Sequence, residues 1–119
     1  PIRDKGATPF LFMTWAYADK PEMIDVLARE YVQAGKDNAI AVVPVGLAFA
    51  RALERRPDIR LHVADRRHPS LEGTYLAACT VLASVYGRNP VGNSYTAGLA
   101  PETAAYLQQI AWETVRAFP

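Results

Sequence analysis

Two short and almost wholly apolar stretches stand out in the first half of the chain. Phe10–Trp15 and Ile40–Val45 each have the length of a strand, and neither alternates with polar residues, as expected for strands buried on both faces. Between them, apolar residues recur at helical spacing, at Met23, Val26, Leu27, Tyr31 and Ala34. The pattern predicts a strand, an amphipathic helix and a second, parallel strand, because parallel strands need a crossover connection.

Local signals predict where the first helices begin and end. Asp19-Lys20-Pro21-Glu22 combines an acidic N-cap, Pro in the first turn and Glu three residues after the cap, and Gly35 is a plausible C-terminal stop. After the second strand, Gly46 is predicted to turn the chain into a helix over Leu47–Arg56, which Pro57 prevents from continuing.

Two longer helices are predicted in the second half, after a short extended piece at Ile59–Ala64. Ser70 can cap a helix over Leu71–Tyr86, whose apolar stripe is Tyr75, Leu76, Cys79, Leu82, Ala83 and Tyr86. A connection rich in Pro, Gly and Asn follows at Arg88–Ala100. The last helix, Pro101–Phe118, is expected to bury Leu107, Ile110, Ala111, Val115 and Phe118. This alternation predicts one α/β domain over residues 1–119, with helices covering both faces of a parallel sheet.

Composition and charge narrow the range of partners. Half of the 119 residues are apolar and the net charge is +1, which is typical of a globular protein. No block of Lys and Arg stands out, so nucleic acid is not an expected partner. The single Cys excludes an internal disulfide and a cysteine metal cluster, and no cofactor or metal is expected. No apolar run approaches the roughly 20 residues that span a bilayer.

The stretch Asp65-Arg66-Arg67-His68-Pro69-Ser70 carries the candidate chemistry. An Asp and a His three residues apart, held by a Pro before a helix start, can direct a carboxylate at one imidazole nitrogen and leave the other nitrogen free. These are two members of an acyl-transfer triad, in which the free nitrogen takes a proton from a hydroxyl nucleophile. The simpler alternative is that Asp65 caps its own loop and His68 is a surface side chain.

The longer pattern Asp65-x-x-His68-Pro69-Ser70-x-x-Gly73-x-Tyr75-Leu76-Ala77-Ala78 resembles the C-terminal block of the SGNH (GDSL-like) hydrolases, whose Asp-x-x-His supplies two triad members. The order of the preceding segments also resembles the later half of that fold, so the likeness covers most of the chain. It implies a flavodoxin-like, three-layer parallel sheet, with this chain as its C-terminal half. It further implies a serine esterase or lipase-type hydrolase acting on a small-molecule ester, acylated carbohydrates included, with His68 as general base and Asp65 as its orienting carboxylate.

The nucleophile is not evident in this sequence. In the SGNH family the nucleophilic Ser and the oxyanion-hole residues should precede Phe10, and nothing similar does so here. The expectation is therefore that these residues lie upstream of Pro1 and that this chain alone is inactive. Gly92-Asn93-Ser94-Tyr95-Thr96 looks like the nucleophile block of some relatives, but it follows a helix rather than a strand. An ordinary turn is the simpler interpretation of Ser94.

Two other functions fit parts of the same sequence. One is a non-catalytic α/β module whose sheet is completed by a second copy or by another chain, because a truncated parallel sheet exposes a strand edge. The other is a flavodoxin-like nucleotide-binding domain. This second alternative is disfavoured, because no Gly-rich phosphate loop follows either apolar strand.

Five further side chains have simpler interpretations than a functional one. His62 is expected on the polar face of its extended segment, and Cys79 is expected to be a small core residue. Trp15 ends a strand, where it can line a ligand cleft or pack in the core. Arg66 and Arg67 either contact an anionic or sugar-like substrate or are solvated loop charges.

Overall fold

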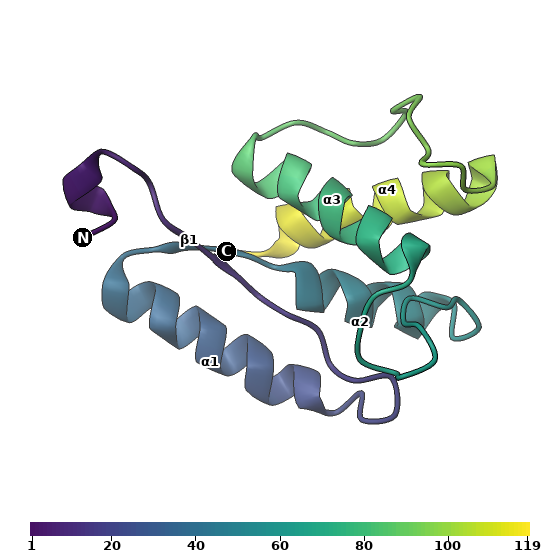
Figure 1. Ribbon diagram of the computed structural model, residues 1–119, viewed down its shortest axis with the longest axis horizontal. Helices are drawn as coiled ribbons and strands as arrows, with labels where there is room; N and C mark the ends of the chain where they lie inside the picture. Colours follow the sequence, from purple (N-terminus) through teal and green to yellow (C-terminus); the bar gives the residue numbers. More distant parts are fainter.

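The computed structural model describes residues 1–119, about half of which are helical. A short 3-10 turn, η1, precedes two strands and four α-helices (Figure 1). Their bounds are η1 Arg3–Lys5, β1 Phe10–Phe12, α1 Met23–Asn38, β2 Ala41–Val43, α2 Val45–Arg55, α3 Leu71–Val85 and α4 Pro101–Ala117. None of the helices combines the length and the apolar character needed to cross a bilayer, in agreement with the sequence.

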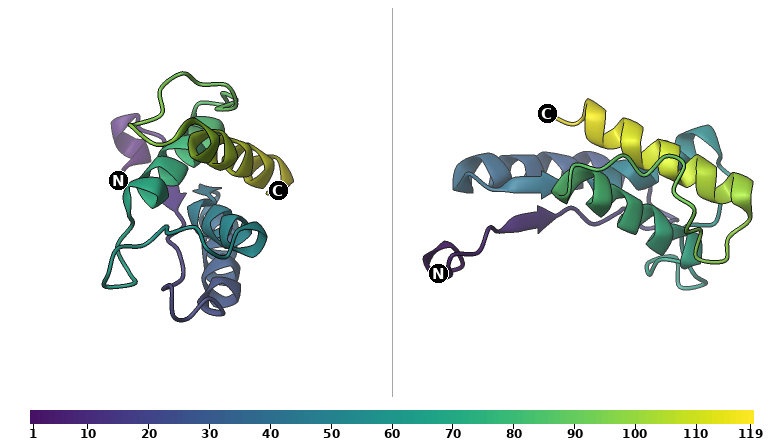
Figure 2. Two further views of the ribbon diagram at one scale, coloured as in Figure 1. Left: turned by 90° about the vertical axis from the view of Figure 1, so that its right-hand side faces the viewer. Right: turned by 90° about the horizontal axis from the view of Figure 1, so that it is seen from above.

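The two strands pair in parallel, and α1 forms the crossover between them. Phe10 lies opposite Ala41, and Phe12 lies opposite Val43. Figures 1 and 2 show α1 on one side of the strand pair and α3 and α4 on the other. The prediction of a strand, a helix and a parallel strand is therefore confirmed, although each strand is only three residues long.

The predicted flavodoxin-like, three-layer parallel sheet is wrong. The only sheet has two strands, and helices make up most of the remaining regular structure. The extended piece Ile59–Ala64 does not add a third strand, because His62 instead forms an antiparallel bridge with Pro69. Its backbone hydrogen bonds thus close a loop and do not widen the sheet.

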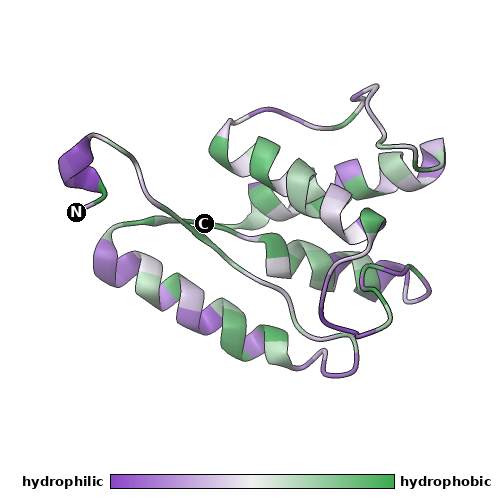
Figure 3. Ribbon diagram, viewed as in Figure 1, coloured by the Kyte–Doolittle hydropathy of each residue, from purple (hydrophilic) through white to green (hydrophobic).

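The core lies between α2, α3 and α4. Thirteen buried residues form one cluster, and Leu107, Ile110 and Ala111 of α4 belong to it as predicted. Figure 3 shows α3 mainly in apolar shades, which agrees with its position between the strand pair and α4. Tyr86, which was predicted in the buried stripe, is 69% exposed because α3 ends at Val85.

The prediction that Gly35 ends the first helix is wrong, and Gly46, predicted to turn the chain just before the second helix, lies inside that helix. Gly35 lies inside α1, where a Cβ would stand 2.8 Å from the carbonyl oxygen of Ile40, and Ala39 takes the left-handed conformation that ends the helix. Gly46 is the second residue of α2, and a Cβ there would collide with the carbonyl of Thr14. Both glycines are needed for close approach to another part of the backbone.

The helix starts differ in how well the capping signals predict them. Ser70 caps α3 as expected, because its Oγ accepts a hydrogen bond from the N–H of Gly73 (3.1 Å). Asp19 does not cap α1, which begins only at Met23 after residues that form turns. The residue before α1, Glu22, makes no side-chain capping bond.

Gly73 allows α3 to pack closely against the segment that precedes the Asp/His loop. A Cβ at this position would collide with the carbonyl of Leu61 and would stand 3.1 Å from Cζ of Phe49. The carbonyl of Leu61 also accepts a hydrogen bond from the N–H of Ser70 (2.8 Å), so it cannot move away freely.

Gly73→Ala is expected to destabilise the protein by about 1–3 kcal/mol through overpacking, even though Ala favours a helix over Gly by about 1 kcal/mol. Urea denaturation measures the change. Thr74→Ala, at an exposed position next along α3, serves as the control and is expected to stay within about 0.5 kcal/mol of the parent. A Gly73→Ala variant as stable as the control would show that α3 does not depend on this contact.

Candidate functional site

Backbone hydrogen bonds close the base of the loop that carries the predicted site residues, Ala64–His68, here called the dyad loop. The N–H of Val63 donates to the carbonyl of His68 (2.9 Å), and the N–H of Ser70 donates to the carbonyl of Leu61 (2.8 Å). Because Ser70 also caps α3, the loop runs directly into the helix N-terminus. The two ends of the loop are therefore fixed by neighbouring elements.

Asp65 and His68 contact each other inside this loop. Nδ1 of His68 lies against Oδ2 of Asp65, while Oδ1 accepts hydrogen bonds from the N–H groups of Arg67 (2.8 Å) and His68 (2.9 Å). The hydrogen bond from the His68 ring and the two backbone N–H groups hold the pKa of the Asp65 carboxyl far below its usual range. The carboxylate is thus charged and oriented at neutral pH.

The second imidazole nitrogen of His68 is free to react. Nε2 has no hydrogen-bond partner in the chain, and the His68 side chain is 79% exposed. Such an imidazole can accept a proton at Nε2, and the Asp65 carboxylate stabilises the resulting cation. The structure thus brings together the two residues that the sequence pattern selected, and their catalytic roles stay a prediction.

The segment that follows β1 is hydrogen-bonded to the dyad loop. Nε1 of Trp15 donates to the carbonyl of Arg67 (2.7 Å), and the N–H of Ala18 donates to the carbonyl of Arg66 (2.9 Å). The guanidinium of Arg67 lies over the ring of Tyr17, 4.8 Å from its centroid. Tyr17 and Ala18 were not among the predicted site residues, and their contacts leave no local sequence signal. The indole N–H of Trp15 is such a signal, because it needs a hydrogen-bond partner when its ring is packed.

Trp15 and His62 pack on the same ring of the core. The Trp15 ring stacks on Phe49 with centroids 4.8 Å apart, and the His62 ring meets Phe49 edge-on at 5.7 Å. Nε2 of His62 also donates to the carbonyl of Ala16 (3.0 Å). The prediction that His62 lies on a polar face is therefore wrong. Its side chain is half-buried and joins the two segments that frame the dyad loop.

Arg66 adopts an uncommon backbone conformation in the middle of the loop. Its φ of +65° lies in the left-handed region, which costs free energy for a residue with a long side chain. Its N–H donates to the carbonyl of Val63 (2.9 Å), and its own carbonyl accepts from Ala18. The side chain extends to 4.0 Å from Asp19, as an exposed charge.

Ser94 is not joined to His68 by any hydrogen bond, and the bend in which it lies is exposed. Its connection, residues 88–100, is fixed to α3 and α4: the hydroxyl of Tyr75 donates to the carbonyl of Tyr95 (2.6 Å), and Nε2 of Gln108 donates to that of Asn93 (3.0 Å). Figure 1 and the left view of Figure 2 place this connection across α3 from the dyad loop. This position favours the interpretation of Ser94 as part of an ordinary turn and not as a nucleophile for His68.

Other candidate chemistry is limited. Cys79 is buried as predicted, and burial raises the pKa of its thiol to about 11, so it is a core residue and not a reactive thiolate. No group of three or more His, Cys, Asp or Glu side chains is arranged to hold a metal ion.

Comparison with known proteins shows a shared fold but no named function. No protein-family model matches the chain, and no curated protein matches it. Among solved structures, a DUF4886 family protein from Bacteroides uniformis is similar, with a TM-score of 0.85 and 24% sequence identity. The match covers 98% of this chain and 52% of the other, so the chain spans about half the length of that protein.

Trp15→Phe is expected to loosen the dyad loop, because it keeps an aromatic ring against Phe49 and removes the donor to the Arg67 carbonyl. The loss should cost about 1 kcal/mol of unfolding free energy and speed hydrogen exchange of the Arg67 and His68 amides, which NMR measures directly. Tyr17→Phe is the matched control, since the Tyr17 hydroxyl makes no hydrogen bond and the ring beneath Arg67 is kept. Equal exchange rates in both variants would contradict the anchoring role.

Proposed function

We propose that this chain supplies the general base and its orienting carboxylate to a serine-type ester hydrolase similar to the SGNH hydrolases. The observation that carries the proposal is the contact between His68 Nδ1 and Asp65, which leaves Nε2 free at the surface. The anchoring of the loop by Trp15 and Ala18 supports it further, because a general base must be held in a fixed orientation.

In the proposed reaction, Nε2 of His68 removes the proton of a serine hydroxyl as that oxygen attacks the ester carbonyl. The imidazolium then returns the proton to the departing alcohol, which leaves an acyl-enzyme. The same nitrogen activates the water that releases the acid. Asp65 holds the ring in one tautomer throughout and offsets its positive charge.

The proposal places the nucleophile and the oxyanion hole on polypeptide outside residues 1–119. No hydroxyl or thiol side chain of this chain is hydrogen-bonded to His68, which supports that placement. The DUF4886 protein is about twice as long as the matched region, so the shared fold can be part of a larger protein.

The surroundings of the dyad support an ester with a polar alcohol, such as an acylated carbohydrate. A shallow depression of about 490 Å³ at the dyad is lined by Asp19, Arg66 and Arg67 together with Asp65 and His68. Charged side chains of both signs can hydrogen-bond to sugar hydroxyls, whereas an apolar alcohol would gain little there.

In the full-length protein, His68→Ala is expected to abolish hydrolysis of p-nitrophenyl acetate, and Asp65→Asn to lower kcat on the order of 10³–10⁴-fold. Thermal unfolding should change little with His68→Ala, because that side chain is 79% exposed. Ser94→Ala is the control and should keep full activity. Turnover that survives in His68→Ala would refute the assignment of the base.

The free edge of β1 favours a second function, a non-catalytic module whose sheet is completed by a second copy. β1 pairs with β2 alone, and Phe10 and Phe12 are 40% and 41% exposed. Unpaired strand edges with exposed apolar side chains commonly pair with another chain.

Sedimentation velocity distinguishes this alternative. A module of this kind should be a dimer that Phe12→Lys dissociates, because a charge would be forced into the shared sheet. Val26→Lys is the control, since Val26 is also an exposed apolar side chain but lies on α1. A monomeric parent protein would rule the alternative out.

A further inference from the structure

We infer that the apolar cleft between the segment after β1 and the outer face of α2 binds the short acyl chain of a neutral ester. The inference rests on the proposed function for the class of ligand. The cleft itself is described by the structure independently of any reaction.

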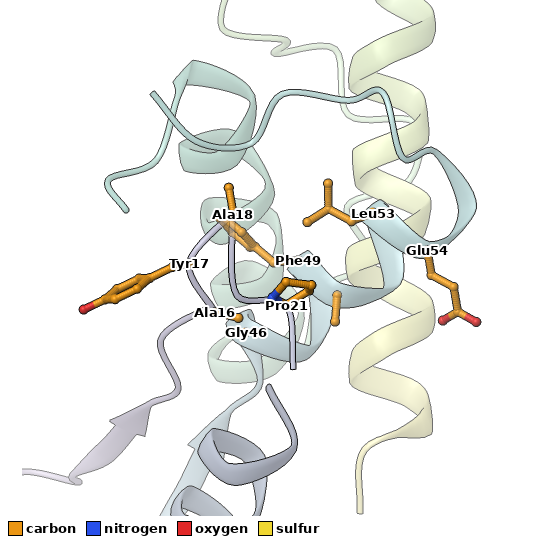
Figure 4. Close-up of a pocket in the computed structure, with 9 residues that line it drawn as sticks. Ala16, Tyr17, Ala18, Pro21, Gly46, Phe49, Leu53 and Glu54 are labelled. Carbon is orange, nitrogen blue, oxygen red and sulfur yellow. The ribbon is translucent and has the colours of Figure 1, made fainter. Parts of the chain in front are cut away.

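The cleft has a volume of about 270 Å³ and is lined mostly by hydrophobic side chains. Ala16, Ala18 and Pro21 form one wall, and the α2 residues Phe49, Ala50 and Leu53 form the other. Figure 4 shows the side chains of Pro21 and Leu53 beside the cleft, whereas the ring of Tyr17 and the carboxylate of Glu54 point away from it. Small-molecule sites commonly measure about 300–1,000 Å³, so this one suits a short chain.

Small residues create the space. Three alanines, Ala16, Ala18 and Ala50, are among the residues that line the cleft, whereas Gly46 lets α2 pack closely against the carbonyl of Thr14. The aromatic ring of Phe49 is held in place by the stacked Trp15, so it cannot swing to fill the space without breaking that contact. The cleft is therefore a consequence of packing that also anchors the dyad loop.

A third depression lies between the cleft and the depression at the dyad, and it shares lining residues with both. This third depression, on the side of His62, shares Ala18 and Leu53 with the cleft. The polar depression at Asp65 and His68 shares Ala64 and Arg66 with that third depression. An ester lying along this surface would direct its acyl chain toward the cleft and its ester group, with the polar alcohol, toward the dyad.

The absence of a cationic side chain in the lining favours a neutral ligand. No cationic side chain lines the cleft, and its one acidic residue, the exposed Glu54, directs its carboxylate away from it. The carboxylate of a free fatty acid would find no cationic partner there, whereas the corresponding ester needs none. The acid released by hydrolysis would accordingly bind more weakly than the ester.

NMR titration of the ¹⁵N-labelled chain with methyl acetate, methyl butyrate and methyl hexanoate tests the inference. The largest shift changes are expected in the amides of residues 16–18 and 46–54. Affinity should rise about fourfold for each added methylene until the cleft is full. Hexanoate anion should bind more weakly than methyl hexanoate. Shift changes confined to other residues, or affinities independent of chain length, would overturn the inference.

Two variants fill the cleft from opposite walls. Ala50→Leu and Ala18→Leu should each lower the affinity for methyl hexanoate at least tenfold. If one of the two variants does not fold, the other still tests the inference. Ala105→Leu, at an exposed position on α4, is the matched control and should bind as the parent does. Unchanged affinity in a folded cleft variant would overturn the assignment.

The binding measurement is independent of turnover, so the two proposals can fail separately. Esters that bind in the cleft of a full-length protein that does not hydrolyse them would refute the proposed function alone. Hydrolysis that depends on His68 without chain-length-dependent binding would refute the acyl site alone.

Discussion

The hydrogen bond from the Trp15 indole to the carbonyl of Arg67 connects the sheet to the candidate site. The indole donates from a fixed direction because its ring stacks on Phe49, which is itself part of the core of α2, α3 and α4. Packing in the core therefore determines the position of a surface loop. Without this bond and the bond from Ala18, two consecutive carbonyls of the dyad loop would be held by solvent alone.

This anchoring explains how an exposed Asp and His can keep a defined geometry. Exposed ion pairs contribute little to stability and are easily replaced by water. Here the carboxylate of Asp65 is fixed by two backbone N–H groups as well as by His68, and these hydrogen bonds require the loop conformation in which Arg66 is left-handed. That backbone conformation costs free energy, which the hydrogen bonds within the loop offset.

Local signals in the sequence were enough to predict part of the fold and the central contact of the site. The spacing of Asp65 and His68, the cap at Ser70 and the long helices α3 and α4 depend on neighbouring residues. Local signals could not establish the flavodoxin-like sheet, because they do not determine which segment an extended piece pairs with. The backbone at His62 pairs with Pro69 and not with a strand of the sheet. The glycines inside α1 and α2, and the bond from Trp15, depend on distant backbone and were missed for the same reason.

Covalent labelling of the full-length protein with a fluorophosphonate ester tests the central claim most directly. In such labelling, a serine oxygen forms a bond to phosphorus as fluoride leaves, and peptide mass spectrometry identifies the modified residue. We predict a label on a serine outside residues 1–119 that disappears in His68→Ala. Labelling that does not change in His68→Ala would contradict the account of this chain as the carrier of the general base, and a label on Ser94 would contradict the placement of the nucleophile outside it.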